Sequence, residues 1–362
     1  MALSLITSIP ATCYTSQLQK IELASSGTAV EFRIYYQAQI YYSGNGQTLI
    51  FNSSYNTRFS CVAIYDIGSL LETFMLERDG LQQVIFEFRA GTDTLSQTYM
   101  VIYCKHLPDI TADTLANSNY ITNYFTRLVY KCSIDRLPYF AGFGSPGSYT
   151  VRTITYSVVY RNPDGTLGTY EMISGGRAGY GISEVDASYD VIRSMFAFAM
   201  PEQAELLSYT LKQGSRIARF FVAEQTIVRQ FAFRNAYGCK EYIAVPTARK
   251  EKVETKSSTA LCSDELTQYD ITHTRSFEEQ TPVLQRAEAR RFEEFLTSHY
   301  TAVLIGSREH PIIIKDYDLK ISDNPGEGNT IKFEWQFASL RTPLISEDYT
   351  RIFSPEHTEQ FT

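Results

Sequence analysis

The sequence predicts a mainly β fold with an α+β C-terminal module, built from consecutive β-sandwich-like modules. The chain has 362 residues, more than a single hydrophobic core usually organises, so several modules are expected. Aromatic residues make up 14%, with 26 Tyr and 22 Phe, and such side chains favour pleated, half-buried surfaces and subunit interfaces. β-Branched and aromatic segments recur between glycine-containing turns, which is the pattern of β-hairpins.

Residues 1–118 are predicted to form a β-sandwich-like module with one short helix. The helix is expected over residues 67–76, capped by Asp66, because its apolar residues recur on one helical face. A glycine-containing turn at residues 43–46 predicts a hairpin between the first two strands. The expected strands are residues 28–42, 47–52, 58–65, 84–88 and 95–104.

Residues 119–225 are predicted to form a second β-rich module. A polar segment, residues 107–123, is expected to be the loop between the two modules. Residues 184–198 fit either a strand or a helix, and residues 201–213 are expected to form a short helix. The expected strands are residues 124–134, 150–160, 167–173 and 216–222, and a flexible loop is expected at Gly175, Gly176, Gly179 and Gly181.

Residues 226–362 are predicted to form an α+β module with one long helix at about 282–298. Thr281 is placed to cap this helix, and Pro282 suits the first helical position. Gly238 is expected at positive φ in a hairpin turn, and the chain after Pro343 is expected to be a polar, extended tail. The expected strands are residues 227–233, 240–245, 303–305, 312–314, 317–321 and 331–337.

Helical spacing predicts how this long helix packs. Its inner side is expected to carry Leu284, Ala287, Arg291, Phe295 and Leu296. These residues are expected to cover a sheet face that carries Ile331, Phe333, Trp335 and Phe337. The helix is therefore expected to stabilise the module and to carry no functional site. Truncating Phe295 should unfold the module and abolish assembly. Truncating Glu294 or His299 should leave assembly intact.

The charge and hydropathy patterns exclude several classes of function. The net charge is −7, and no block of Lys and Arg is long enough to follow a phosphate backbone, so nucleic acid is not expected as a partner. No stretch approaches about 18 apolar residues, so no membrane insertion is expected. The first 21 residues lack the pattern of a signal peptide, which predicts synthesis in the cytoplasm. The mixed-sign run at residues 249–256 is interpreted as a solvated loop or strand end.

The cysteines are expected to be buried free thiols in a reducing compartment. All six lie far apart, with no CxxC pair, which disfavours both a disulfide framework and a zinc site. They are Cys13, Cys61, Cys104, Cys132, Cys239 and Cys262.

No residue pattern predicts catalytic, cofactor-binding or metal-binding residues, so the chain is not expected to be an enzyme. The five histidines never stand three or four residues apart, where a helix presents two of them to one metal. The adjacent pairs Glu278–Glu279 and Glu293–Glu294 are interpreted as solvated charges rather than an acid–base pair. A glycoside hydrolase is kept as a third hypothesis, because the spacing of its two acids exists only in three dimensions.

One segment carries a family resemblance. Residues 231–241, with the sequence FAFRNAYGCKE, are similar to the aromatic Asn-x-x-Gly hairpin of tail proteins in phages and prophages of Bacteroides-type bacteria. The resemblance extends over residues 225–337, where polar strands, a helix and closing strands follow in that order. Cys239 departs from the family pattern, which usually has a small residue there.

The resemblance implies a structural component of a phage or phage-like tail, in the distal tail or baseplate region. Such a protein acts by self-assembly and subunit docking without catalysis, and it sits in the virion tail as a ring of copies beside other tail or baseplate proteins. The alternative is a carbohydrate- or receptor-binding adhesion module, in which surface Tyr residues and Trp335 stack on sugar rings. Trp335 itself is expected in the core of an alternating strand.

Overall fold

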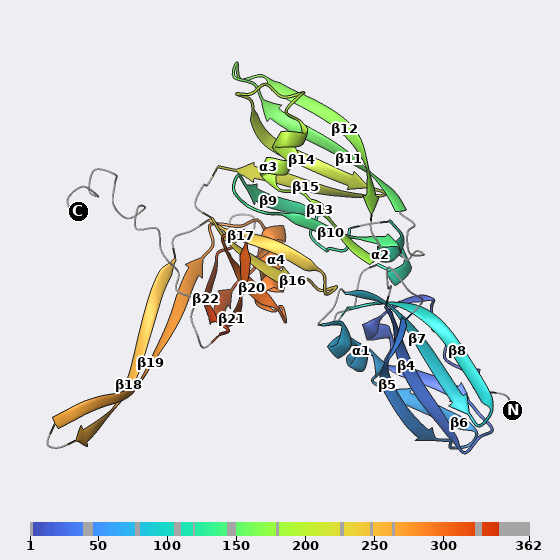
Figure 1. The fold of residues 1–362 in the computed structure, drawn as a ribbon. Helices are drawn as coiled ribbons and strands as arrows, with labels where there is room; N and C mark the ends of the chain where they lie inside the picture. Colours follow the sequence, from blue (N-terminus) through green and yellow to red (C-terminus); the bar gives the residue numbers. More distant parts are fainter. Residues whose placement is uncertain are drawn as a thin grey trace.

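The fold is mainly β, as Figure 1 shows for the computed structural model of the chain. Strands make up 59% and helices 13%, and one of the sheets curls into a half-barrel. The prediction of a mainly β fold is therefore confirmed, while the β-sandwich arrangement stays a prediction. The structure describes residues 3–38, 46–76, 80–104, 110–118, 120–142, 150–178, 181–224, 228–246, 249–262, 265–322 and 328–339.

The first part of the chain folds into a five-stranded sheet, ordered β2-β8-β7-β4-β5, and a three-stranded sheet, ordered β1-β3-β6. The expected helix is present as α1, but Asp66 does not cap it through its side chain, because Asp66 adopts a left-handed backbone at φ 59°. The expected turn at residues 43–46 lies outside the described residues, apart from Gly46. The elements are β1 (Ser4–Leu5), β2 (Thr12–Tyr14), η1 (Thr15–Gln17), β3 (Lys20–Ala24), β4 (Ala29–Ala38), β5 (Gly46–Asn56), β6 (Cys61–Tyr65), α1 (Ile67–Met75), β7 (Leu81–Ala90) and β8 (Asp93–Ile102).

The segment expected to be a loop between modules contains a helix, α2 (Ala112–Ser118). The Thr111 hydroxyl accepts a hydrogen bond from the Thr114 N–H at 3.2 Å, which satisfies one free donor at the start of the helix. Ala112, Leu115 and Ala116 are buried. These three apolar residues are few, and polar residues stand on both sides of them in the sequence. The segment therefore resembles a loop, and the loop prediction was wrong.

The middle of the chain forms a five-stranded sheet, ordered β12-β11-β14-β15-β9, and a two-stranded sheet of β10 and β13. The helix expected over residues 201–213 is wrong, because β14 runs there and pairs with both β11 and β15. Gly175 and Gly176 lie within β12 and not in a flexible loop. The elements are β9 (Thr126–Tyr130), β10 (Arg136–Gly142), β11 (Thr150–Arg161), β12 (Leu167–Ala178), β13 (Gly181–Asp186), α3 (Tyr189–Met195), β14 (Glu205–Gln213) and β15 (Arg216–Ala223).

The last part forms a seven-stranded sheet, ordered β17-β16-β20-β21-β22-β19-β18, with one helix. The expected hairpin is confirmed as β16 and β17, and Gly238 has φ 71° in its turn. The expected tail after Pro343 lies outside the described residues. The elements are β16 (Arg229–Arg234), β17 (Lys240–Val245), β18 (Lys250–Cys262), β19 (Glu265–Gln280), α4 (Arg286–Leu296), β20 (Thr301–Ile305), β21 (Arg308–Leu319) and β22 (Ile331–Phe337).

Helix α4 begins later and ends earlier than expected. Thr281 does not cap it: its hydroxyl accepts the Ile331 N–H at 2.9 Å, and Leu284 is bridged to Asn329. This strand-like pairing keeps residues 281–284 out of the helix. Ala287 was placed on the inner side but is exposed, and Ala289 and Phe292 lie in the core instead.

Three apolar cores lie within residue ranges 13–103, 120–222 and 231–337. The third contains Phe295, Phe333 and Trp335, so the predicted packing of α4 on the sheet is confirmed for these residues. The ring centroids of Phe295 and Phe333 are 5.6 Å apart. The module boundaries at 118 and 225 stay a prediction.

A fourth apolar cluster, here called the junction core, joins the three parts of the chain. Its buried residues come from the first sheet, from α2, from β10 and from the turn between β16 and β17. They are Tyr14, Leu81, Ile102, Cys104, Ala112, Leu115, Ala116, Ile121, Phe140, Tyr237 and Cys239. The three parts are therefore packed together through a shared core.

The hairpin of β18 and β19 projects away from the body of the molecule (Figure 1). Within the described residues, only Ser276–Gln280 of β19 pairs with β22, so the rest of the hairpin is two-stranded there. Every described side chain of β18, from Lys250 to Thr259, is exposed. We call residues 250–275 the arm.

The described cysteines are free thiols, but not all are buried as expected. Cys61 and Cys132 are exposed, whereas Cys13, Cys104 and Cys239 are buried. Cys262 lies where side chains are not described. No helix within the described parts of the chain is long and apolar enough to cross a membrane.

Candidate functional site

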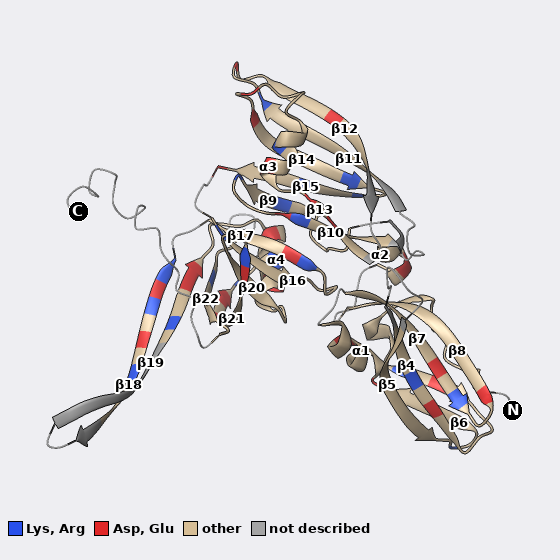
Figure 2. Cartoon of the chain, in the orientation of Figure 1, with Lys and Arg blue, Asp and Glu red and all other residues tan. Residues whose placement is uncertain are grey.

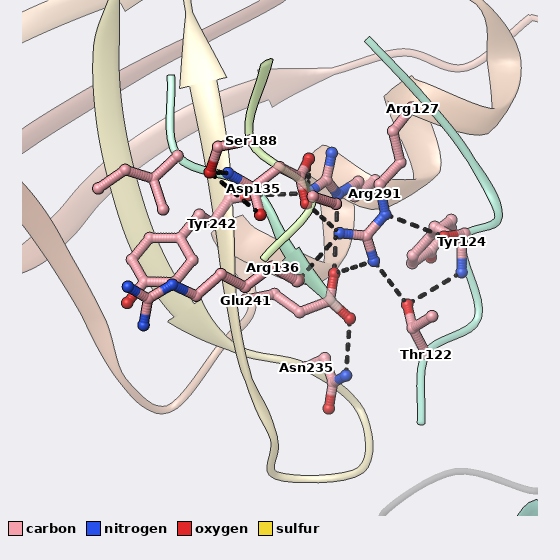
Figure 3. A network of polar contacts seen from close by, with 12 residues as sticks. Thr122, Tyr124, Arg127, Asp135, Arg136, Ser188, Asn235, Glu241, Tyr242 and Arg291 are labelled. Carbon is pink, nitrogen blue, oxygen red and sulfur yellow. Dashed lines mark hydrogen bonds and ion pairs between the residues drawn. The ribbon is translucent and has the colours of Figure 1, made fainter. Parts of the chain in front are cut away.

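The most concentrated polar chemistry in the described residues is a buried charge network between the middle and last parts of the chain (Figure 3). Its centre is Arg127 on β9, whose side chain is fully buried. The guanidinium donates to Asp135 at 2.7 Å and to Glu241 on β17 at 2.6 Å. It also donates to the Thr122 hydroxyl at 3.1 Å and to the Tyr124 carbonyl at 3.1 Å. Arg127 thus connects β9 with β17.

Helix α4 enters the same network through Arg291. Its guanidinium lies 3.5 Å from Asp135 and 3.8 Å from Glu241, and it donates to the Tyr242 carbonyl. One turn earlier, Glu288 accepts the Leu128 N–H at 2.8 Å and lies 3.9 Å from Arg291. We call the set of Arg127, Asp135, Glu241, Glu288 and Arg291 the charge network.

The Asn-x-x-Gly turn supplies a further contact to the network. The Asn235 amide donates to Glu241 at 2.8 Å and to the Ile121 carbonyl at 2.8 Å. Its carbonyl oxygen accepts the N–H groups of Tyr237 and Cys239, each at 3.0 Å. The side chain thereby stabilises the turn from within. Asn235 therefore both stabilises the turn and connects it to the charge network and to Ile121 in the middle of the chain.

Burial and ion pairing act in opposite directions on the network. Burial disfavours the charge on Arg127, yet Glu241 and Asp135 outweigh it and raise the pKa of the guanidinium. Burial also raises the pKa of Glu288, against the opposing effect of Arg291. The side chains of Arg127 and Glu241 are 0% exposed. A substrate has no access to such groups, and their ion pairs connect β9 with β17 and with α4.

A close backbone approach fastens the first part of the chain to the same turn. A Cβ added at Gly80 would lie 1.6 Å from the Tyr237 carbonyl oxygen, and one added at Gly238 would lie 3.1 Å from the Gly80 Cα. Both positions therefore require glycine, Gly238 also because of its positive φ. The Asn-x-x-Gly turn is thus the point where all three parts meet.

A cavity of about 460 Å³ opens beside this turn, at the C-terminal end of α4. Among its lining residues are Leu76, Tyr124, Arg234, Glu294 and His299. Glu294 Oε1 accepts the Ala236 N–H at 2.5 Å, whereas Oε2 is buried and has no hydrogen-bond partner among the described residues. Burial, reinforced by Glu241, raises the pKa of Glu294 to about 8.

Glu294 corrects the interpretation of the Glu293–Glu294 pair as two solvated charges. Glu293 fits it, since its half-exposed carboxylate pairs with Arg290 at 2.7 Å. Glu294 does not, because its second oxygen is buried. Of the pair Glu278–Glu279, Glu279 is likewise buried, and its carboxylate accepts a hydrogen bond from Trp335 Nε1 at 3.3 Å. Sequence spacing alone gives no signal that distinguishes the members of either pair.

No known protein-family model matches the chain, and neither does any curated protein. Within the described residues, no group of three or more His, Cys, Asp or Glu side chains could hold a metal ion.

Proposed function

We propose that the chain is a structural component of a phage or phage-like tail, in the distal tail or baseplate region. It acts by self-assembly and subunit docking without catalysis, through β-sandwich-like modules arranged in a ring of copies. It is synthesised in the host cytoplasm and ends in the virion tail beside other tail or baseplate proteins.

The observation that carries this proposal is the arm. A two-stranded hairpin in water is at best marginally stable, and three or more strands or a packed face are normally needed. The described side chains of β18 are exposed on both faces. Docking on a neighbouring subunit provides the missing packing, and it explains why a long hairpin projects from an otherwise well-packed chain.

The contacts inside the molecule support a structural role, because they hold the parts of the chain rigidly together. The charge network and the junction core fix three parts of the chain against one another. A building block of a ring needs this rigidity, because a fixed angle between its two contact surfaces is what closes the ring.

The alternative is a carbohydrate- or receptor-binding module, in which Trp335 was expected to stack on a sugar ring. The structure leaves Trp335 unavailable for this contact. Trp335 is 1% exposed and stacks on Phe277 with ring centroids 4.4 Å apart. The expectation that this side chain faces the core is confirmed. Exposed tyrosines such as Tyr65 and Tyr317 remain as stacking groups for this alternative.

Two measurements on the purified chain and on particles test the proposal. Light scattering should give the mass of a ring of several copies, and labelled antibodies should locate the protein at the distal end of virion tails by electron microscopy. A protein that stays monomeric at all concentrations and is absent from particles would contradict it. Binding to a glycan array by that monomer would favour the alternative.

A further inference from the structure

The arm forms one edge of the seven-stranded sheet, and this edge is long. Strand β18 is the last strand of the seven-stranded sheet and has 13 residues. At about 3.3 Å per residue it spans roughly 43 Å. Its outer N–H and C=O groups pair with no strand in the described parts of the chain. An unpaired edge of this length is a template for another strand.

A second long edge lies at the other side of the molecule. Strand β5 is the last strand of the first five-stranded sheet and has 11 residues, GQTLIFNSSYN, without a charged residue or a proline. Proteins normally protect sheet edges with charges, prolines or short strands. The edge strand β12 has such charges, Glu171 and Arg177. The edge of β5 has neither charge nor proline, so it is the better acceptor.

The charges of β18 itself and of the N-terminal part have opposite signs. Strand β18 contains three basic and two acidic residues, a net charge of +1. Residues 1–118 contain six basic and ten acidic residues, a net charge of −4. Lys250, Lys252 and Lys256 point to the same face of β18, together with Glu254, since side chains alternate along a strand. Figure 2 shows how basic and acidic residues alternate near the base of the arm.

The geometry points to a contact between two copies of the chain. We propose that β18 of one copy adds to the free edge of β5 in the next copy, so that arm and N-terminal sheet form one continuous sheet. The two edges lie at opposite sides of one molecule (Figure 1), so a single copy does not pair them itself. Such a head-to-tail contact generates a ring when its rotation closes. This inference rests on the proposed function and gives its docking surfaces.

Three variants test the contact by analytical ultracentrifugation. In the first, residues 253–275 are replaced by Asn-Gly, which joins the paired residues Lys252 and Ser276 and leaves the pairing of β19 with β22 in place. In the second, Asn52→Lys and Ser54→Lys place positive charge on exposed positions of β5. The control, Thr169→Lys with Ile173→Lys, makes the same change at exposed positions of the edge strand β12.

The first two variants are expected to raise the subunit concentration at half assembly by about tenfold or more, and the control to leave it unchanged. Adding Lys250→Glu, Lys252→Glu and Lys256→Glu to the β5 variant should restore assembly, because the new glutamates on β18 then attract the new lysines on β5. Circular dichroism checks that each variant is folded.

The outcomes separate the two proposals. If the wild-type chain does not assemble and is absent from particles, the proposed function fails. If the wild-type chain assembles and the first two variants assemble equally well, the proposed function stands and the contact is wrong. Loss of assembly in the β12 control, with the β5 variant unaffected, would overturn the choice of edge.

Discussion

Arg127 on β9 and Glu241 on β17 form an ion pair at 2.6 Å in which both side chains are fully buried. Glu241→Gln leaves Arg127 and Arg291 with too little compensating charge in a buried site. Breaking such a pair from one side costs about 3–5 kcal/mol of unfolding free energy. Urea denaturation followed by fluorescence measures this loss.

A surface ion pair provides the control for Glu241→Gln. Glu205 pairs with Arg161 at 3.4 Å, and the Arg161 side chain is 53% exposed. Such pairs contribute about 0–1 kcal/mol. Equal effects of Glu241→Gln and Glu205→Gln would show that the charge network does not fasten the structure.

Phe295→Ala should destabilise the last part of the chain by about 3–5 kcal/mol, because it removes a fully buried ring and leaves a cavity. The ring contacts Phe231 and Phe333 with centroids 5.3 and 5.6 Å away. Thermal unfolding and light scattering should show both lower stability and loss of assembly. Val283→Ala, at a position 69% exposed, is the control and should change neither.

Glu294→Gln should remove a pH dependence of stability. The pKa of Glu294 is about 8 in the folded chain against an ordinary value of 4.5, so the folded chain holds this proton more tightly than the unfolded chain. The resulting stability is fully present below pH 4.5 and is lost as the pH rises to 8, with a slope of at most about 1.4 kcal/mol per pH unit. Gln stays neutral, so the variant should be more stable than the wild type above pH 8.

The neighbouring Glu293→Gln is the control for this measurement, since Glu293 is half exposed and pairs with Arg290. Urea denaturation at pH 4, 6 and 8.5 gives the three curves. Parallel pH dependences of the wild type and Glu294→Gln would contradict a buried, protonated Glu294.

Gly80→Ala should loosen the attachment of the first part of the chain to the turn at Tyr237 and Gly238. The added Cβ would lie 1.6 Å from a backbone carbonyl oxygen, which does not move aside as a flexible side chain does. Overpacking of this kind costs about 1–3 kcal/mol. Gly27→Ala is the control, because its Cβ meets its neighbours at 3.4 Å or more. Limited proteolysis should cut the first part of the chain faster in Gly80→Ala than in Gly27→Ala, and equal rates for the two variants would oppose this account.

Local patterns predicted the elements whose stability is local. The hairpin of β16 and β17, helix α1 and most strands follow from alternation and turn residues, and Gly238 has the expected positive φ. The failures depend on distant partners. Residues 201–213 were expected to contain a helix, but residues 205–213 form a strand because β11 and β15 flank them. Helix α4 starts late because Thr281 and Leu284 pair with residues far along the chain.

The charge network could not be predicted for the same reason. Arg127 and Glu241 stand 114 positions apart, and no spacing rule connects them. The charged run at residues 249–256 was interpreted as a solvated loop or strand end, and it is solvated; the projection of the whole hairpin was not foreseen. Whether such a run ends a strand within a sheet or belongs to a projecting hairpin depends on which strands pair with it, and the sequence does not show this.

The most direct test of the central claim is native mass spectrometry of the purified chain at low ionic strength. The account predicts one dominant species whose mass is a fixed multiple of the chain mass, and its dissociation as salt screens the arm contact. A single species with the mass of one chain, at every protein and salt concentration, would contradict assembly as the function of this protein.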